Sequence, residues 1–520
     1  MEYIPTIGLE IHCELKTASK MFCSCPNNPD NPPNTNVCPV CLGHPGTLPV
    51  ANREAIRLTR LVGLALDSRI LERSKFDRKN YFYPDLPKGY QISQYDQPLC
   101  LGGCLAVNDG GKTKKIGITR VHLEEDTGKL MHTENKDHSL VDFNRGGVPL
   151  MELVTDPDIE NANQAREFVK ELQLILRHLG ASDADMEKGQ LRVEVNISLG
   201  EIAPDGPPTG EARPSGGPPA GEARPSGGTK KLGTKVEIKN LNSLKAVEGS
   251  VAHEIGRQTA LIKNGKPVVQ ETRGWNEFTG QTFSQREKEE AFDYRYFPEP
   301  DIPPLAISPE EIKKLKASVG ELPAKKRSRL AEQYGLDGAI VEIFVVNRDL
   351  GEYFEKTASE LEEWANVKEG DRENSDVQNH RLARLCANYL TTDVLGALSG
   401  KPFCEKEFPV SPENFAEFIC LIYKGEITSK IAKQVLAEMV ETGSDPSAII
   451  TQRGLSQISG KKEIAGIVGE VMARNAKAVA DYRAGKQNAF QFLIGQVLAA
   501  TEGRANPDVL KEVLLEELGK

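Results

Sequence analysis

The chain has 520 residues, 39% of them hydrophobic, which is enough for about three or four domains with their own cores. Its formal net charge is −10, so a nucleic acid would have to bind where basic groups gather locally. No apolar stretch is long enough to cross a membrane, and no positively charged start leads into an apolar segment, so we expect a cytoplasmic protein without a signal peptide.

The first predicted strand is residues 9–15, where apolar and polar residues alternate. Alternate side chains of a strand point to opposite faces, so Glu10, His12 and Glu14 would share one face. Neighbouring members of this set would lie ~6.6 Å apart along the strand. An acidic face of this kind either contacts solvent or belongs to a functional site.

Two cysteine pairs follow this strand, Cys23 with Cys25 and Cys38 with Cys41. The loop between the pairs is rich in Asn and Pro and poor in apolar residues, so it needs something other than a core to hold it. A tetrahedral Zn²⁺ bound by four thiolates would do so, and we expect a structural zinc site here. The alternatives are a reduced loop with incidental cysteines and a disulfide, which the absence of a signal peptide disfavours.

Three further segments alternate in the same way and are predicted to be strands. They are residues 118–126, 191–199 and 235–241, and their polar faces carry Arg120, His122 and Glu124, then Arg192 and Glu194, then Lys235, Glu237 and Lys239. Several strands that each present acids together with Lys or Arg favour a converging site over an ordinary solvated sheet face.

The end of the segment 118–126 leaves one assignment open. Strand parity places Glu124 beside His122, whereas a one-residue bulge would bring in Glu125 instead. Carboxylates with a single histidine and no thiolate suit a hard cation, and Mg²⁺ that accompanies phosphates is the commonest reason for such an open site.

Residues 1–295 contain short alternating runs and many turn residues, which predicts one large antiparallel α+β domain. Within it, the Gly- and Pro-rich segment 203–230 holds an imperfect duplication of residues 206–216 as 217–227. We expect this segment to be a flexible insertion, because loop-closure entropy grows only slowly with loop length.

The proline run 298–304 marks the expected first domain boundary, since helical periodicity dominates after it. We expect an all-α domain over residues 296–400 and, after a weaker break near Gly400, an all-α tail over residues 401–520. The chain lacks a phosphate-binding loop, a nucleophile elbow and an obvious Cys/His pairing for glutamine hydrolysis. Any amide nitrogen that it uses must therefore come from elsewhere.

Several stretches match one family closely. They are residues 7–12, 76–94, 122–129, 142–145, 239–243, 293–301 and 492–497. On these residues the chain resembles the B subunits of the aspartyl/glutamyl-tRNA(Asn/Gln) amidotransferases, the GatB/GatE family. The match at 76–94 is long and specific, and the resemblance covers nearly the whole chain apart from the insertion.

The resemblance implies an α+β protein in three parts. These are an N-terminal antiparallel-sheet cradle domain with a kinase-like site for ATP and Mg²⁺, an all-α central domain, and an all-α tail that is similar to the YqeY family and contacts tRNA. The resemblance also implies a heterotrimer, in which the amidase (glutaminase) or A subunit frees ammonia from glutamine and the small C subunit braces the pair.

The implied reaction is the ATP-dependent amidation of misacylated Glu-tRNA(Gln) and/or Asp-tRNA(Asn). The side-chain carboxylate attacks the γ-phosphate, and ammonia then displaces phosphate from the acyl phosphate. Phosphoryl transfer requires that the reacting groups are positioned and that the charge of the phosphates is neutralised. Mg²⁺ together with Lys and Arg side chains can therefore suffice for this step. The alternative is a non-catalytic, zinc-containing tRNA-binding scaffold whose partner performs all the chemistry.

By match to the family, the candidate catalytic and magnesium-binding residues are Glu10, His12, Glu125 and Glu237, with Glu124 and Glu194 as second choices. The family pattern and strand parity disagree over Glu124 and Glu125, and the family choice is kept, with a bulge as the expected reason.

Basic and aromatic side chains of residues 78–88 suit the phosphates and unstacked bases of a tRNA acceptor end. The candidates are Arg78, Lys79, Tyr81, Tyr83 and Lys88. The alternative is a structural loop packed on the sheet, with Phe82 as its core anchor. In the tail, candidates for contact with the tRNA backbone are Lys424, Lys430, Lys433, Lys486 and Arg504.

Overall fold

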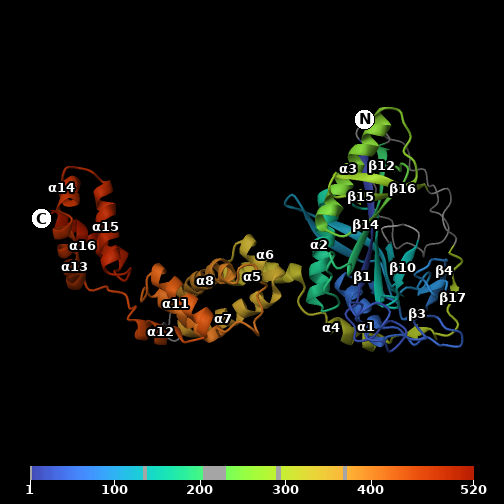
Figure 1. The fold of residues 1–520 in the computed structure, drawn as a ribbon, viewed down its shortest axis with the longest axis horizontal. Helices are drawn as coiled ribbons and strands as arrows, with labels where there is room; N and C mark the ends of the chain where they lie inside the picture. The colour runs from blue at the N-terminus through green and yellow to red at the C-terminus, as the bar shows by residue number, and fades with distance from the viewer. Residues whose placement is uncertain (1–2, 133–137, 203–229, 288–293, 367–371, 520) are drawn as a thin grey trace. The chain divides into compact units, whose positions relative to one another are not determined.

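The computed structural model describes five ranges of the chain, which are residues 3–132, 138–202, 230–287, 294–366 and 372–519. The insertion expected at 203–230 lies, apart from its last residue, outside these described ranges. The chain forms two compact units, Met1–Pro323 and Ala324–Lys520 (Figure 1). Within the described ranges, no helix combines the length and the apolar character that a membrane crossing needs.

An eleven-stranded sheet forms the centre of the first unit. Its main path runs through β16 (Gln281–Glu287), β15 (Glu271–Asn276), β14 (Val236–Leu241), β12 (Leu191–Ile202), β1 (Tyr3–Glu14), β11 (Pro149–Thr155), β8 (Lys112–Glu125), β6 (Cys100–Leu101) and β2 (Arg69–Ile70). Two further strands pair with this path, β13 (Lys230–Lys231) with β12 and β7 (Cys104–Asp109) with β8. The described pairings are antiparallel apart from the parallel pair β14 and β15, so the sheet is mainly of the expected kind.

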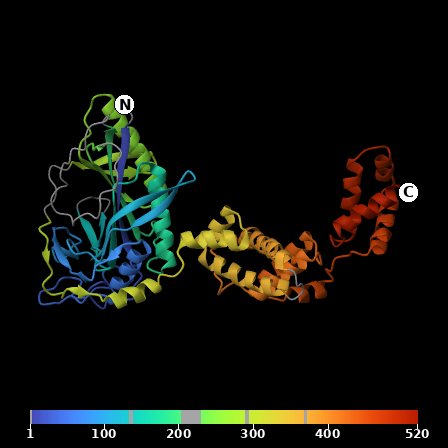
Figure 2. The same ribbon diagram turned by 180° about the vertical axis from the view of Figure 1, so that it is seen from behind.

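Alternation along β1 separates a buried face from a polar face. Leu9 and Ile11 are fully buried, and they share one hydrophobic cluster with Phe168 and Val251. Those two side chains come from helices that lie along the sheet in Figures 1 and 2, α2 (Ala162–His178) and α3 (Leu244–Lys263). A third helix, α1 (Arg53–Ala65), packs against β8. The buried face is therefore covered by helices, which leaves the polar face of β1 for other contacts.

A small second sheet lies opposite this polar face. It consists of β17 (Phe297–Pro298), β4 (Asp77–Asn80) and β5 (Tyr90–Ser93). Two separate strand pairs are formed by β3 (Arg73–Ser74) with β18 (Leu305–Ala306) and by β9 (Lys129–His132) with β10 (Ser139–Asp142). The helix α4 (Pro309–Ala317) begins with a capping box at Ser308. The first unit thus ends at Pro323, later than the expected 295, because β17 and β18 pair with strands of the first hundred residues.

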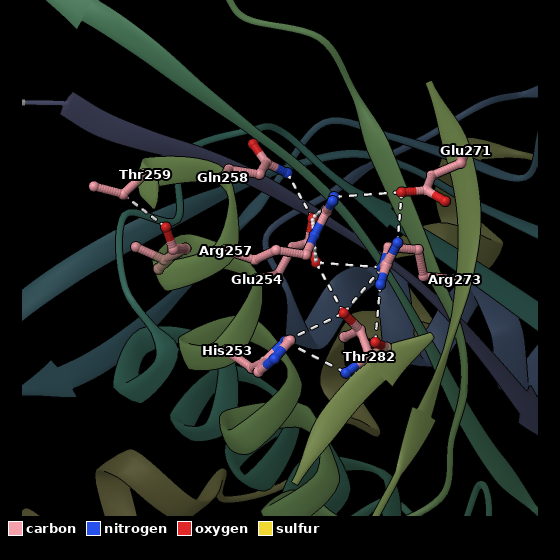
Figure 3. A network of polar contacts seen from close by, with 9 residues as sticks. His253, Glu254, Arg257, Gln258, Thr259, Glu271, Arg273 and Thr282 are labelled. Atoms are coloured by element: carbon pink, nitrogen blue, oxygen red, sulfur yellow. Dashed lines mark hydrogen bonds and ion pairs between the residues drawn. The ribbon is translucent and has the colours of Figure 1, made fainter. Parts of the chain in front are cut away.

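An ion-pair network fastens the last two strands at one side of the sheet, β15 and β16, to α3 (Figure 3). The carboxylate of Glu254, which is fully buried, accepts from Arg257 Nη2 at 2.6 Å and from Thr282 Oγ1 at 3.1 Å. Arg273 of β15 lies 3.6 Å from the same carboxylate and 2.5 Å from Glu271. The network therefore holds β15 and β16 in one place against the helix.

The second unit is helical in its described residues. One hydrophobic cluster joins eight helices and a π-helical turn, which are α5 (Pro323–Tyr334), α6 (Gly338–Val346), α7 (Arg348–Asn366), α8 (Arg372–Tyr389), the turn Leu390–Val394, α9 (Leu395–Ala397), α10 (Pro412–Tyr423), α11 (Ser429–Thr442) and α12 (Pro446–Arg453). A separate cluster joins α13 (Lys461–Arg474), α14 (Ala476–Arg483), α15 (Asn488–Ala500) and α16 (Pro507–Gly519).

The break between these two cores falls later than the expected break at residue 400. Residues on both sides of 400 belong to the first cluster, and Tyr353 Oη donates to the carbonyl of Val410 at 3.1 Å. The chain after Gly400 continues into the same core because α10 packs against α7 and α8. The two hydrophobic cores of the second unit are therefore divided near residue 455. Helix packing sets this boundary, and the weak break at Gly400 in the sequence did not indicate it.

Candidate active site

A polar hollow of about 390 Å³ lies between the main sheet and the small sheet. One wall consists of side chains from β1, β8, β11, β12 and β14, and the other consists of side chains from residues 79–91 and 294–296. Five neighbouring strands turn alternate polar residues to this side, as the alternation in the sequence predicts. The volume lies within the ~300–1,000 Å³ that ligand sites usually occupy.

Glu152 of β11 stands at the centre of this wall. It is the cross-strand neighbour of His12 on β1 and of His122 on β8. Its Oε2 lies 3.4 Å from Nε2 of His12 and 3.3 Å from Nε2 of His122. Glu10 and Glu124 complete the cluster, at 3.8 Å and 3.9 Å from Nε2 of His12. Three carboxylates therefore surround Nε2 of His12, and both histidines contact the same oxygen atom of Glu152.

Two sets of three side chains in this cluster offer ligand atoms that lie within 4.8 Å of one another. One set is Glu10, His12 and Glu152, and the other is His122, Glu124 and Glu152. Carboxylate oxygens with an imidazole nitrogen are a donor set that fits a hard divalent cation. The residues of the hollow thus fit Mg²⁺ chemically.

Burial and the charges of neighbouring groups shift the pKa values of this cluster. The pKa values of Glu10 and His12 rise, whereas that of Glu152 falls. Burial, followed by the negative charge of Glu152, raises the pKa of Glu10 to about 7. Burial alone would lower the pKa of His12, but its hydrogen bond to Glu152 and the surrounding carboxylates raise it to about 9. The two histidines in turn hold the pKa of Glu152 well below its usual value, against the effect of burial. Protonated His12 therefore supplies the positive charge that these carboxylates need when no cation is bound, and a bound cation would take the place of that proton.

The structure turns Glu124, rather than Glu125, into the hollow. The pairing of β8 with β11 runs without a shift from Glu125 opposite Pro149 to Arg120 opposite Val154, so the bulge expected near Glu125 is absent there. Consecutive residues of a regular strand point in opposite directions. The carboxylate of Glu124 accepts from Ser93 Oγ at 2.9 Å, whereas that of Glu125 pairs with Lys88 and lines a different cavity. The expectation that Glu125 joins Glu10 and His12 is therefore wrong in its geometry.

Glu237 and Glu194 line the same hollow beside the central cluster. Lys239 Nζ lies 2.9 Å from Glu194 Oε2 and 3.6 Å from Glu237 Oε1. Thr272 Oγ1 of β15 also donates to Glu237 at 3.0 Å. The structure thus brings Glu237 into the hollow, but outside both sets of three that could hold a cation.

The candidates of residues 78–81 divide between two sides of β4. Lys79 and Tyr81 line the hollow. Burial lowers the pKa of Lys79, but the carboxylates of Glu124 and Glu152 outweigh that effect and raise it. Arg78 points away and binds Glu299 at 2.6 Å. Lys79 is therefore placed for a ligand in the hollow, whereas Arg78 holds β17 to β4.

The remaining candidates lie elsewhere. Tyr83 and Phe82 are 60% and 81% exposed, so Phe82 is not the core anchor that the alternative interpretation expected. Lys88 pairs with Glu125, and Lys486 of the helical unit pairs with Asp481 at 2.9 Å. The two exposed aromatic rings stay available for a partner molecule.

The four cysteines come together as the sequence predicts. The sulfur atoms of Cys23, Cys25, Cys38 and Cys41 lie within 4.8 Å of one another, which makes a possible metal site. A hydrogen bond from the Cys23 side chain lowers the pKa of Cys41 to about 5, and the charge of Lys20 contributes in the same direction. Four sulfur donors at this spacing fit the tetrahedral coordination of Zn²⁺.

Lys20 lies fully buried behind this cysteine cluster. Its Nζ donates to the carbonyls of Asn36, at 2.9 Å, and Phe143, at 3.4 Å. Asn144 ties the same loop down, since it accepts from the amide of Asn36 at 2.9 Å. The loop between the cysteine pairs is therefore held by polar contacts as well as by the cysteines.

Sequence reasoning missed several residues of the hollow. Glu152 is a lone acid in the apolar run Pro149–Thr155, and a charge in such a run is a signal that could have been used. Tyr294 and Tyr296 also line the hollow, although they are far from β4 in the sequence. Their contribution depends on the pairing of β17 with β4, which the sequence pattern does not specify.

Comparisons with known proteins extend these observations. A family model described as GatB/GatE catalytic domain matches residues 5–313, and one described as GatB domain matches residues 374–518. A protein of Ruminiclostridium cellulolyticum, named as the B subunit of aspartyl/glutamyl-tRNA(Asn/Gln) amidotransferase, is 43% identical over 520 residues, which cover 100% of this chain and 98% of its own length. A protein of Persephonella marina with the same name is 44% identical over 518 residues and is covered in full, as is this chain.

A sheet-rich catalytic domain followed by a helical GatB domain defines the class of protein. The chain belongs to the family of aspartyl/glutamyl-tRNA(Asn/Gln) amidotransferase B subunits.

Proposed function

We propose that the polar hollow is the site where this protein activates the side-chain carboxylate of Glu-tRNA(Gln) and/or Asp-tRNA(Asn) with ATP. The observation that carries the proposal is the set Glu10, His12 and Glu152, whose ligand atoms lie within 4.8 Å of one another in a hollow that Lys79 also lines. The names of the relatives support an aminoacylated tRNA as the substrate.

The fit of the donor set to Mg²⁺ supports a cation held by Glu10, His12 and Glu152, with Glu124 beside them. When bound with a triphosphate, the ion would neutralise the charge that develops on the phosphate oxygens. Lys79 adds a positive charge that can bind the transferred phosphoryl group. Arg120, Arg192 and Lys239, which also line the hollow, are basic groups at its other strands.

The chemistry balances with these groups alone. A substrate carboxylate oxygen forms a bond to the γ-phosphorus, the bond to the bridging oxygen breaks, and ADP leaves. Ammonia then attacks the acyl carbon, the bond from that carbon to the phosphate oxygen breaks, and the departing phosphate takes one proton of the ammonia and leaves as hydrogen phosphate, which yields the amide. The attacking carboxylate is already anionic, so the first step needs no general base.

The amidation step also needs a source of ammonia and a way to hold the tRNA. Ammonia would come from an amidase A subunit, with a small C subunit in the same complex, and the exposed rings of Phe82 and Tyr83 would meet the tRNA acceptor end. The cysteine site would hold a structural Zn²⁺. We expect this complex to act in the cytoplasm.

The test uses the reconstituted complex with misacylated tRNA. The substitution Glu152→Gln should lower tRNA-dependent release of the γ-phosphate by at least about 100-fold, because it removes the carboxylate shared by both cation sets. Glutamine hydrolysis and tRNA binding should stay near their original values. Glu187→Gln, at an exposed site outside the hollow, is the matched control. Unchanged phosphate release in Glu152→Gln would reject the proposal and favour the non-catalytic tRNA-binding scaffold.

A further inference from the structure

Three tyrosines form a wall of the polar hollow. Tyr81, Tyr294 and Tyr296 all line it, and their ring centroids follow one another at 5.9 Å and 6.1 Å with steep, edge-to-face angles of 71°. Tyr95 stacks on Tyr296 at 4.4 Å, with only 13° between the two ring planes. Tyr95 is not among the lining residues, so it supports Tyr296 from behind.

Backbone contacts and conformation hold two of these rings in place. Residue 294 is tied to β4 because Asn80 N donates to the carbonyl of Tyr294 at 2.9 Å, and Asn80 Nδ2 donates to the carbonyl of Arg295 at 2.8 Å. Arg295 has φ of 42°, in the left-handed region that a non-glycine residue adopts only at a cost. Tyr294 and Tyr296 line the same hollow, whereas Arg295 between them is exposed.

The aromatic wall lies beside the charged part of the hollow. Lys79 Nζ stands 5.1 Å from the centroid of the Tyr294 ring, a distance at which a cation and a ring attract each other. The same lysine is within the electrostatic reach of Glu124 and Glu152. A flat ring bound on the wall would therefore have its substituents close to the groups that suit a cation and phosphates.

We propose that Tyr294 and Tyr296 form a stacking subsite for an adenine base. The inference rests on the proposed function, which brings adenine to the hollow from two sources, ATP and the 3′-terminal adenosine of tRNA. Adenine offers the planar face that tyrosine rings bind, and a base attached to phosphates matches a wall that adjoins Lys79. In this subsite the two tyrosines contact the ligand as well as each other.

The experiment measures binding to the full-length chain by equilibrium dialysis. Its ligands are ATP and tripolyphosphate, both with Mg²⁺, and tRNA with and without its terminal adenosine. The substitution Tyr296→Leu should weaken the binding of an adenine-bearing ligand by roughly 5- to 150-fold, which is the usual range for one stacked base. Tripolyphosphate should bind equally to both proteins, because it has no base.

Two further variants separate stacking from damage to the fold. Tyr296→Phe keeps the ring and should bind each ligand within about twofold of the original affinity, since stacking does not need the hydroxyl. Tyr423→Leu removes a 40% exposed tyrosine of α10 and should change none of the affinities. Loss of binding in both Tyr296 variants, tripolyphosphate included, would assign the tyrosine a structural role and overturn the subsite.

The ligand series also separates the two sources. A loss confined to ATP identifies the nucleotide as the occupant, and a loss confined to tRNA with its terminal adenosine identifies the RNA end; either result supports the subsite. Unchanged affinity for both in Tyr296→Leu overturns it, while leaving the proposed function intact. Failure of the original chain to bind Mg²⁺ with ATP or tripolyphosphate would instead contradict the proposed function.

Discussion

Glu124 and Glu125 are neighbours in β8, yet their carboxylates open into different cavities. Glu124 lies 3.9 Å from Nε2 of His12 in the polar hollow. Glu125 pairs with Lys88 and accepts from the amide of Ile92 at 2.9 Å, beside the cysteine cluster. One step along a regular strand therefore separates a group placed for cation binding from a group placed for a buried ion pair.

This difference gives the first prediction. Glu124→Gln should weaken the binding of Mn²⁺, used as a paramagnetic substitute for Mg²⁺, by about 10-fold or more, with little effect on stability. Glu125→Gln should leave the binding of Mn²⁺ within about twofold but lower the free energy of unfolding by about 3 kcal/mol, because Lys88 would be left buried without its partner. Titrations followed by electron paramagnetic resonance and urea denaturation measure the two effects. The reverse pattern would restore Glu125 as the cation ligand.

A second prediction concerns the metal at the cysteines. Cys38→Ser should lose one equivalent of zinc, as measured by elemental analysis of the purified chain, and should lower the melting temperature of the first unit. The control is Cys404→Ser, since Cys404 lies outside the four-cysteine cluster. A finding of no zinc in the unaltered protein would reject the assignment.

The third prediction follows from Lys20, whose buried ammonium donates to two backbone carbonyl oxygens. A Zn²⁺ ion with four thiolates carries a net charge of about −2, so this lysine would neutralise part of that charge. Lys20→Met keeps most of the length of the side chain and should weaken zinc affinity by roughly 10-fold. Lys16→Met removes an exposed ion pair with Asp183 and should leave it unchanged.

Competition against a zinc-binding dye measures this affinity directly. The absorption bands of Co²⁺ bound in place of zinc provide a second readout, because they report whether four thiolates still coordinate. Equal zinc affinity in Lys20→Met and the unaltered protein would contradict the electrostatic role of Lys20.

The fourth prediction concerns the network of Figure 3. Arg273→Met removes one of the two arginines near the buried Glu254 and leaves Glu271 without its 2.5 Å partner. We expect a loss of about 3 kcal/mol in the free energy of unfolding, measured with urea. Arg474→Met, which removes a surface pair with Glu470, is the control and should cost less than about 0.5 kcal/mol.

Hydrogen exchange locates this effect. In Arg273→Met, the amides of β15 and β16 should exchange faster than those of β1, because the network fastens these two outer strands to α3. Equal acceleration across the whole sheet would show that the network does not act locally on the edge.

Part of this protein could be predicted from residue patterns alone. Alternation in β1 fixed which side chains share a face, so Glu10 and His12 were expected together, and they are together in the hollow. The paired cysteines and the helical periodicity after the proline run 298–304 were equally informative. These features follow from spacings of a few residues, and local geometry sets them within one element.

Other features depended on which elements meet. Glu152 enters the cluster because β11 lies between β1 and β8, and Tyr296 enters the hollow because β17 pairs with β4 across more than two hundred residues of sequence. The choice between Glu124 and Glu125 depended on the register of β8 against β11. Sequence alone thus determined which faces are polar and where the cysteines could gather, whereas the tertiary structure decided which polar groups converge, because strand order and register are set by packing over the whole sheet.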